Sequence, residues 1–261
     1  MATIRGSAIT ALLTLLVLLV FVSPTLTSNI LENSRSASSE QAKTLPVTVL
    51  PMGGDNGQRE VELACDDVQL SAPNSIQKLS CVLKNQSAKS ITAGTLAVTI
   101  NLEAHGRIEP VTAYDTFDSF LHPDFRRQHA TNQIRPGETY RLDIGPAAYD
   151  GKVVSIAAAV DYVEFLDGST TDPEAMGARI LSNLREGATK YKRWLAQKFT
   201  EKKKSVDAIV PLLHDRQDLP SELMLSNSDQ QQGARLYRDH ARRSYEKRGR
   251  AVLAEELNRA P

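Results

Sequence analysis

The sequence predicts a mainly β protein with an added α region, in which an antiparallel β-sandwich is followed by a charged helical segment. Two observations lead to this fold class. Between residues 47 and 172, stretches of alternating or β-branched residues are separated by turn-forming residues, and none of them has a helical period. From residue 173 onward, apolar residues recur every three or four positions among many charges, which is typical of amphipathic helices.

The first 28 residues have the pattern of a segment that directs a chain to the membrane. Arg5 is the only charge before Glu32, and an apolar run at residues 8–22 is followed by Pro24. The run is shorter than the roughly 20 residues that span a bilayer, which favours a cleaved signal peptide. No A-x-A cleavage site follows it, so an uncleaved N-terminal anchor stays open. In either case we expect an exported protein, periplasmic or secreted.

The chain divides into four parts by composition. After residues 1–28, the segment 29–46 is polar, rich in serine and without period, which predicts a disordered linker. The predicted sandwich spans residues 47–172, and the predicted helical tail spans residues 173–261.

Five segments of the body are predicted as strands because their apolar residues alternate or are β-branched. They are residues 60–65, 78–84, 91–102, 139–144 and 153–166.

Turn-forming residues follow or precede these strands in three places. The segments are LKNQS at 83–87, RPGE at 135–138 and DYVEFLDG at 161–168. With these segments the body resembles the Ig-like or fibronectin-type sandwiches of uncharacterised bacterial exported proteins. The resemblance implies an Ig-like β-sandwich, and it implies no activity.

Cys65 and Cys81 are the only two cysteines. They fall at the end of one predicted strand and in the middle of the next, and an exported chain meets an oxidising compartment. We therefore expect a disulfide, with Cα atoms roughly 4.4–6.8 Å apart. Closing a loop of this size stabilises the fold by about 3 kcal/mol. The absence of a C-x-x-C pattern speaks against a redox or metal role.

Residues 114–129 hold the densest group of possible metal ligands in the body. Asp115 and Asp118 precede the three candidate ligands, His122, Asp124 and His129. Zinc accepts histidine and carboxylate ligands, but this spacing matches no common zinc motif. The alternative is a long loop between strands, held in place by its three phenylalanines.

Two amphipathic helices are predicted in the tail, at residues 173–204 and 229–258. The apolar stripe of the first could pack on the sandwich or on the same helix of a second copy, giving a homo-oligomer. The second has a thin stripe, so we expect it to be loosely attached and available to a partner.

Charge is distributed unevenly between the body and the tail. Residues 47–173 carry 10 Lys and Arg against 17 Asp and Glu, whereas residues 174–261 carry 18 against 12. Seven cations lie close together in the second helix, which indicates either a solvated face or contact with anionic membrane lipid or envelope polymer. Export makes nucleic acid an improbable partner. The seven are Arg235, Arg238, Arg242, Arg243, Lys247, Arg248 and Arg250.

No motif of a known catalytic class is present: there is no G-x-S-x-G elbow, no Walker loop and no dinucleotide-binding glycine pattern. We therefore expect a non-enzymatic exported binding or scaffold protein of the cell envelope, without a cofactor and with an unidentified partner. The alternative is an envelope hydrolase with a metal site in residues 114–129.

Overall fold

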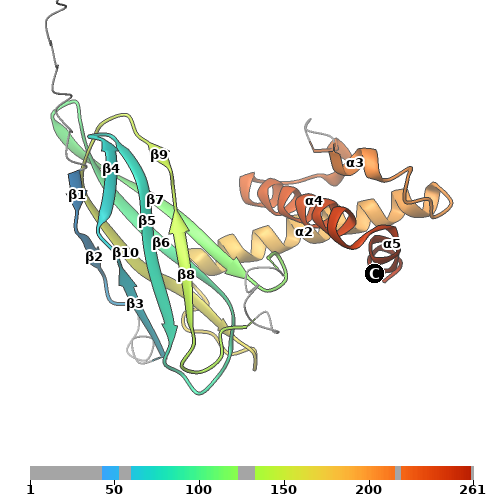
Figure 1. Cartoon of the computed structure of the whole chain (residues 1–261), viewed down its shortest axis with the longest axis horizontal. Coiled ribbons are helices and arrows are strands. Elements are labelled where there is room, and N and C mark those ends of the chain that lie inside the picture. Colours follow the sequence, from blue (N-terminus) through green and yellow to red (C-terminus); the bar gives the residue numbers. More distant parts are fainter. Residues whose placement is uncertain (1–42, 53–59, 123–132, 215–218, 260–261) are drawn as a thin grey trace, which may run out of the picture. The chain divides into compact units, whose positions relative to one another are not determined.

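A computed structural model describes residues 43–52, 60–122, 133–214 and 219–259, and Figure 1 shows the elements that they form. The predicted targeting segment and the linker as far as residue 42 lie outside the described residues. The end of the predicted linker is strand β1 (Lys43–Leu45), so the ordered body begins earlier than the predicted boundary at Val47.

The first sheet is antiparallel, and its central strand is β5. One half of β5 pairs with β4 and β9, and the other half pairs with β3 and β8, while β1 pairs with the outer edge of β4. The strands are β1, β3 (Val61–Cys65), β4 (Val68–Ala72), β5 (Ser75–Asn85), β8 (Thr139–Ile144) and β9 (Ala147–Ala148).

The second sheet is mixed, which corrects the expectation of a purely antiparallel sandwich. Its strand order is β2-β10-β6-β7, and β2 runs parallel to β10. Pro46 lies between β1 and β2, which belong to different sheets. Because proline has no N–H for a sheet ladder, the strand breaks there, and the chain passes from one sheet to the other. The strands are β2 (Val47–Val49), β6 (Ile91–Ala104), β7 (Arg107–Asp118) and β10 (Lys152–Phe165).

The sandwich architecture is confirmed, but its strand order differs from that of an immunoglobulin constant domain. That domain places its first, second, fourth and fifth strands in one sheet and the other three in the second sheet. Here we count β1–β2, β3–β4 and β8–β9 as one strand each. Among the described strands, the second, third and sixth then form one sheet, the fourth, fifth and seventh form the other, and the first contributes one half to each.

The expected disulfide is confirmed between β3 and β5. Cys65 and Cys81 are direct register partners, with an S–S distance of 2.06 Å and a Cα–Cα distance of 4.0 Å, slightly below the expected range. The next pair along is hydrogen-bonded, because Asp66 N–H donates to Ser80 O. The cysteines therefore occupy a non-hydrogen-bonded pair, where facing side chains lie closest.

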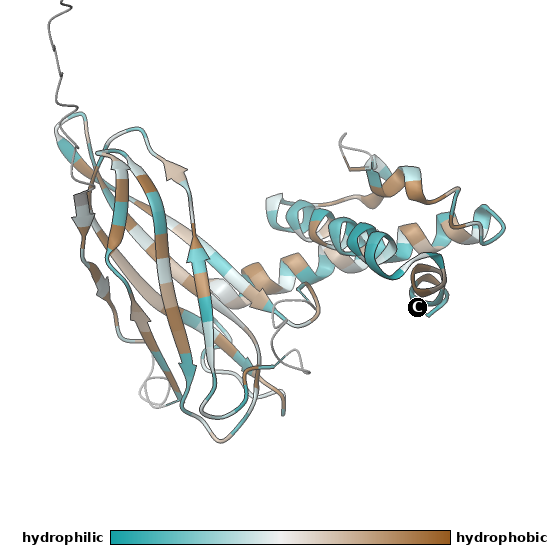
Figure 2. Ribbon diagram, viewed as in Figure 1, coloured by the Kyte–Doolittle hydropathy of each residue, from teal (hydrophilic) through white to brown (hydrophobic). Residues whose placement is uncertain are grey.

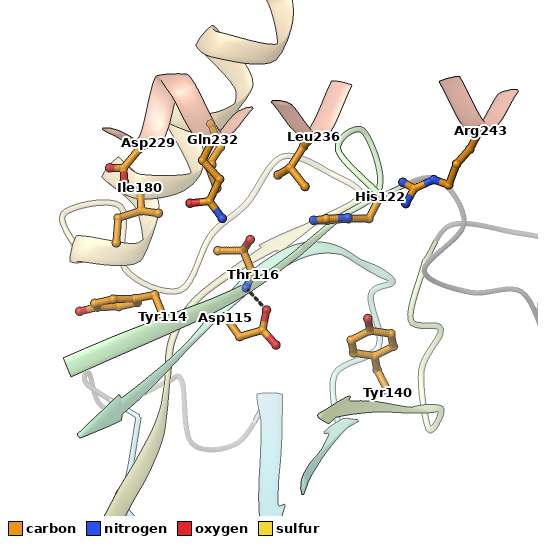
Figure 3. Close-up of a pocket in the computed structure, with 11 residues that line it drawn as sticks. Tyr114, Asp115, Thr116, His122, Tyr140, Ile180, Asp229, Gln232, Leu236 and Arg243 are labelled. Atoms are coloured by element: carbon orange, nitrogen blue, oxygen red, sulfur yellow. Dashed lines mark hydrogen bonds between the residues drawn. The ribbon is translucent and has the colours of Figure 1, made fainter. Parts of the chain in front are cut away.

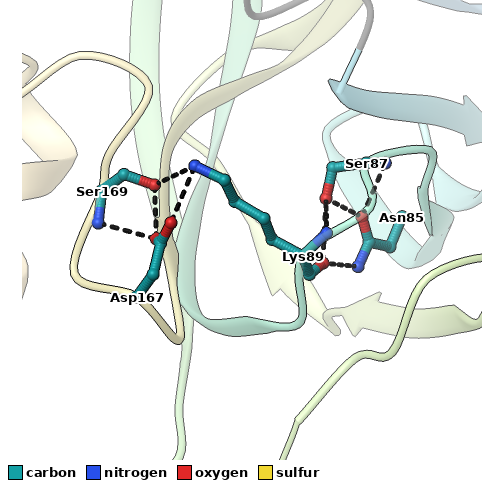
Figure 4. Close-up of polar contacts among 5 residues, drawn as sticks. All are labelled: Asn85, Ser87, Lys89, Asp167 and Ser169. Carbon is teal, nitrogen blue, oxygen red and sulfur yellow. Dashed lines mark hydrogen bonds and ion pairs between the residues drawn. The ribbon is translucent and has the colours of Figure 1, made fainter.

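Two turns at the same end of the sandwich are tied together by side chains (Figure 4). The buried Asn85 at the end of β5 donates to the carbonyls of Lys89 and Ile134, both at 2.7 Å. Lys89 Nζ reaches the turn after β10, where it contacts Asp167 Oδ2 at 2.9 Å and Ser169 Oγ at 2.8 Å. The segments predicted as turns are thus joined although they are far apart in the sequence.

The helical region begins at α2, within the predicted first helix. The second predicted helix is two helices, because Gly249 lies between them with a φ of +84° that favours glycine. The helices are α2 (Met176–Glu201), α3 (Val210–His214), α4 (Ser228–Arg248) and α5 (Arg250–Asn258), with a 3-10 turn at Ser221–Leu223.

Helix α4 is packed closely against α2, so the expectation of a loosely attached second helix was wrong. Figure 2 shows that α4 is mostly hydrophilic, as its sequence indicates. The close packing comes instead from two glycines, which let the backbones of α2 and α4 approach each other directly. A Cβ at Gly187 would lie 1.9 Å from Gln230 O, and one at Gly233 would lie 1.9 Å from Leu184 O.

The buried face of α2 is covered within the chain itself. The apolar stripe expected to pair with the sandwich or a second copy packs against α4, α5 and the outer face of the second sheet. At the sheet, Gly177 N–H donates to Asp161 Oδ2 at 2.5 Å. The residues buried along this face include Leu181, Leu184, Ala188, Tyr191 and Leu195. Within the described ranges, none of the helices combines the length and the apolar character needed to cross a membrane.

Candidate ligand pocket between the sandwich and the helices

A pocket of about 600 Å³ lies where β7 and β8 of the sandwich meet α2 and α4 (Figure 3). Both parts of the protein contribute to its wall: the sandwich supplies mostly polar side chains, and the helices supply three apolar and three polar or charged ones. The lining residues are Tyr114, Asp115, Thr116, His122, Tyr140, Ile180, Leu184, Asp229, Gln232, Leu236 and Arg243.

The floor of the pocket is the outer edge of β7. Ser119 N–H donates to Thr92 O at 3.1 Å, and alternate residues of an antiparallel strand turn their backbone groups toward the partner strand. By this alternation, Tyr114 and Thr116 turn their backbone groups away from β6. Asp115 Oδ1 accepts the Thr116 N–H at 2.8 Å. Burial raises the pKa of Asp115, although this hydrogen bond opposes the shift.

His122 is held in place by the buried carboxylate of Asp118, which ends β7. Asp118 Oδ1 accepts the N–H groups of Phe120 and Leu121, both at 2.8 Å, and His122 N–H donates to the Asp118 carbonyl at 2.8 Å. The turn therefore fixes the imidazole at the pocket wall. Burial lowers the pKa of His122; Asp118 opposes this shift and Arg243 adds to it.

Arg185 of α2 joins this turn to the helical region. The Asp118 side chain is fully buried, and its Oδ2 accepts from Arg185 Nε at 3.0 Å and from Nη2. Arg185 Nη1 lies 2.8 Å from Glu164 Oε2 on β10. One guanidinium thus links α2 to two strands of the sandwich. This arrangement holds α2, against which α4 packs, to the strand that forms the floor of the pocket.

The roof of the pocket is one stripe of α4. Asp229, Gln232, Leu236 and Arg243 follow one another at spacings of three, four and seven residues, which places them on one side of a helix. The buried residues of α4, such as Gly233 and Tyr237, lie on another side and face α2 and α5. The helix can therefore dock on α2 and still present this stripe to the sheet.

Arg243 brings a guanidinium to the pocket wall. Its Nε is buried and has no hydrogen-bond partner in the described part of the chain. In Figure 3 its guanidinium lies beside the His122 imidazole, at one end of the stripe, and Asp229 lies at the other end. A buried guanidinium nitrogen without a hydrogen-bond partner destabilises the folded protein. An anionic ligand that accepts this hydrogen bond removes the cost.

The structure separates the residues that were candidates for metal binding. Asp118 is committed to Arg185, whereas Asp115 and His122 line the pocket. Asp124 and His129 lie outside the described residues. Among the residues that are described, no three His, Cys, Asp or Glu side chains are grouped so that they could hold a metal ion. The expectation of a loop at residues 114–129 was wrong for its first five residues, which belong to β7.

The seven tail cations do not share one surface. Arg243 faces the pocket, and Arg250 on α5 pairs with Asp207 Oδ1 at 2.8 Å. Arg242 pairs with Asp239 at 3.3 Å, and Arg248 donates to Ser244 Oγ at 2.7 Å. The remaining three are Arg235, Arg238 and Lys247, of which Arg235 and Lys247 are exposed.

Comparison of the chain with protein-family models, with curated proteins and with solved structures gives no match. The chemistry of the site therefore has to be argued from its own residues.

Sequence reasoning missed most of the pocket. The stripe on α4 has a helical spacing that could have been found, but its cations were grouped by their distance along the chain and not by helix face. The link between Arg185 and Asp118 joins residues 67 positions apart. No local pattern marks such a pair.

Proposed function

We propose that this protein is an exported, non-enzymatic binding protein of the cell envelope, and that its ligand occupies the pocket between the sandwich and the helices. The observation that carries the proposal is a pocket lined from both regions, with a partly buried guanidinium whose Nε has no hydrogen-bond partner among the described residues. Pockets with apolar walls and a few placed polar groups are the usual sites of ligand binding.

Export is supported by two independent features. The apolar segment near the N-terminus has the pattern of a signal peptide or anchor. The Cys65–Cys81 disulfide is of a kind that persists in oxidising compartments. The sandwich architecture also agrees with the proposed likeness to Ig-like exported proteins, although the strand order departs from the immunoglobulin one.

Binding is favoured over catalysis because the carboxylates in and next to the pocket already form hydrogen bonds within the protein. Asp115 accepts the Thr116 N–H, and Asp118 holds the turn and Arg185. The pocket groups follow β7 and α4 along their length, whereas an acid–base or metal mechanism needs several groups within reach of one atom. This arrangement suits recognition of an elongated molecule.

The test is to incubate the purified protein with fractionated envelope extract, wash it, and identify the released molecules by mass spectrometry. Leu236→Trp should abolish the retained species, because the larger side chain fills the pocket. Leu166→Trp is the matched control, because Leu166 is exposed just after β10 and does not line the pocket. Equal retention by both variants and the wild type would contradict the proposed site.

The alternative proposal is an envelope hydrolase with a metal held by residues of the segment 114–129. It is favoured by one observation, the position of His122 in the pocket wall with a pKa lowered by burial. A neutral imidazole is the form that binds zinc. The same experiment separates the two proposals, because a hydrolase would release cleaved products and a binding protein would release an unchanged molecule.

A further inference from the structure

We propose that the ligand of this pocket is a short extended peptide, lying along β7 with its carboxylate at Arg243 and its amino end at Asp229. This inference rests on the proposed function and specifies the chemical class of the ligand. Three features of the pocket support it: the charges at its two ends, the free edge of β7, and the apolar side chains between the ends.

The end charges set the polarity and the length of the ligand. Asp229 and Arg243 lie on the same stripe of α4, 14 residues apart. At 1.5 Å per residue this separation is about 21 Å along the helix axis. An extended peptide advances about 3.3 Å per residue, so about six residues fill the distance. A negative group at one end and a positive group at the other match the two termini of a peptide.

The edge of β7 supplies backbone hydrogen bonds. The outward-facing groups at Tyr114 and the outward-facing carbonyl of Thr116 have no neighbouring strand among the described residues, because β7 pairs only with β6 there. An extended peptide can add to such an edge through its own N–H and C=O groups. Figure 3 shows the stripe of α4 above these residues, so a strand in this position would lie between α4 and the sheet.

The middle of the pocket suits peptide side chains. Ile180, Leu184 and Leu236 form its apolar part, and they come from the helices opposite the strand edge. Side chains of an added strand alternate between its two faces, so one set would contact this apolar surface. A sugar chain would match the polar groups but would leave the apolar contacts and the strand edge unused.

Arg243 is the most specific element of the proposal. A guanidinium holds a carboxylate through two parallel hydrogen bonds, and Nε is one of the donors that such a pair uses. The buried Nε of Arg243 has no partner among the described residues. The C-terminal carboxylate of a peptide can accept a hydrogen bond from this Nε and carries a negative charge. A C-terminal amide carries no charge.

The experiment uses a library of hexapeptides with free termini and the same library with C-terminal amides. Both are equilibrated with the purified protein, and the bound peptides are identified by mass spectrometry and measured by calorimetry. We expect amidation to weaken binding at least about tenfold, as expected for the loss of one partner of a buried charge pair. Arg243→Gln should weaken the free peptide by a similar factor and leave the amide unchanged. Arg235→Gln, on the exposed side of the same helix, is the control and should change neither.

Equal binding of free and amidated peptides, or an Arg243→Gln effect on both, would overturn the inference. Acidic oligosaccharides are tested in parallel, and their binding in place of peptides would also overturn it. If no peptide binds but Leu236→Trp still removes a ligand captured from extract, the inference fails and the proposed function stands. If neither peptides nor extract molecules bind, both fail.

Discussion

The sandwich core is filled by side chains from long strands, whereas the helical core combines buried side chains with a close backbone contact between α2 and α4. In β6 and β10, one face of each strand is buried along almost its whole length, and Cys65–Cys81 adds a covalent link in the other sheet. Between α2 and α4, glycines 187 and 233 bring the backbones together, and the buried Gln230 side chain bonds to Glu186 and Lys190.

The difference teaches where each region is sensitive to change. A core of large side chains tolerates small changes at many positions, because neighbours can repack. A contact between two helix backbones does not tolerate an added side chain, because the atoms in the way are backbone atoms that cannot rotate aside. The pocket lies between the two regions and is spanned by the Arg185–Asp118 pair, so its geometry depends on both.

The largest expected effect is that of Asp118→Ala. It leaves Arg185 without its main partner and the turn before His122 without its acceptor. Breaking a buried ion pair costs about 3–5 kcal/mol. The measurement is the free energy of unfolding in denaturant. The control is Glu109→Gln, which removes the exposed pair with Arg107 and should cost at most about 1 kcal/mol. Similar losses in both variants would contradict the importance of the buried pair.

Removing the disulfide should weaken the sandwich by about 3 kcal/mol, because the unfolded chain gains entropy. The variant is Cys65→Ala with Cys81→Ala, and the measurement is again unfolding in denaturant. A reducing agent should destabilise the wild type and leave this variant unchanged. A loss of stability without reductant sensitivity in the wild type would show that the two thiols are not bridged.

Gly187→Ala tests the contact in the helical region. Alanine in a helix is normally favoured over glycine by about 1 kcal/mol. Here its Cβ would lie 1.9 Å from Gln230 O, so we expect a net loss of about 2–3 kcal/mol as α4 is pushed away. The exposed Gln231→Ala on α4 is the control, with little expected change. A stabilised Gly187→Ala protein would show that the helices do not touch there.

The smallest expected effect concerns Asp143 in the sandwich. The Ser80 hydroxyl, with Lys78 and Arg141, lowers the pKa of Asp143 to about 2. A carboxyl group whose pKa is lowered in the folded protein stabilises the fold at pH values above its ordinary pKa. This stabilisation is lost as the pH falls from about 4 to about 2. Asp143 is half exposed, so the contribution is below about 1 kcal/mol. Asp143→Asn should therefore lower stability at pH 5 and approach the wild type at acid pH; a constant difference would contradict this.

The sequence predicted the longer strands of the core, but it missed β4, which has a buried face, and β7, which lines the pocket. β7 contains Pro110 and several acidic residues, which are uncommon in strands. They are tolerated because β7 is an edge strand of its sheet in the described structure, where a proline costs no ladder hydrogen bond on the open side. An edge position is a tertiary property, so alternation along the strand could not reveal it.

The helical region was predicted in its elements and not in its packing. The apolar period predicted α2, but no local pattern marks the role of Gly233, because glycine by itself only lowers helix propensity. Its role depends on Leu184 of another helix, 49 positions away. Arg243 likewise differs from the six other cations in that its place on the helix surface makes it line the pocket.

The most direct test of the central claim is hydrogen–deuterium exchange of the protein with and without its captured ligand. With the ligand bound, we expect slower exchange on both sides of the pocket, in the segment from Tyr114 to His122 and along α4 from Gln232 to Arg243. Exchange in β3 and in α5 should stay unchanged. Protection confined to the first sheet, or to one wall of the pocket alone, would contradict a ligand held between the sandwich and the helices.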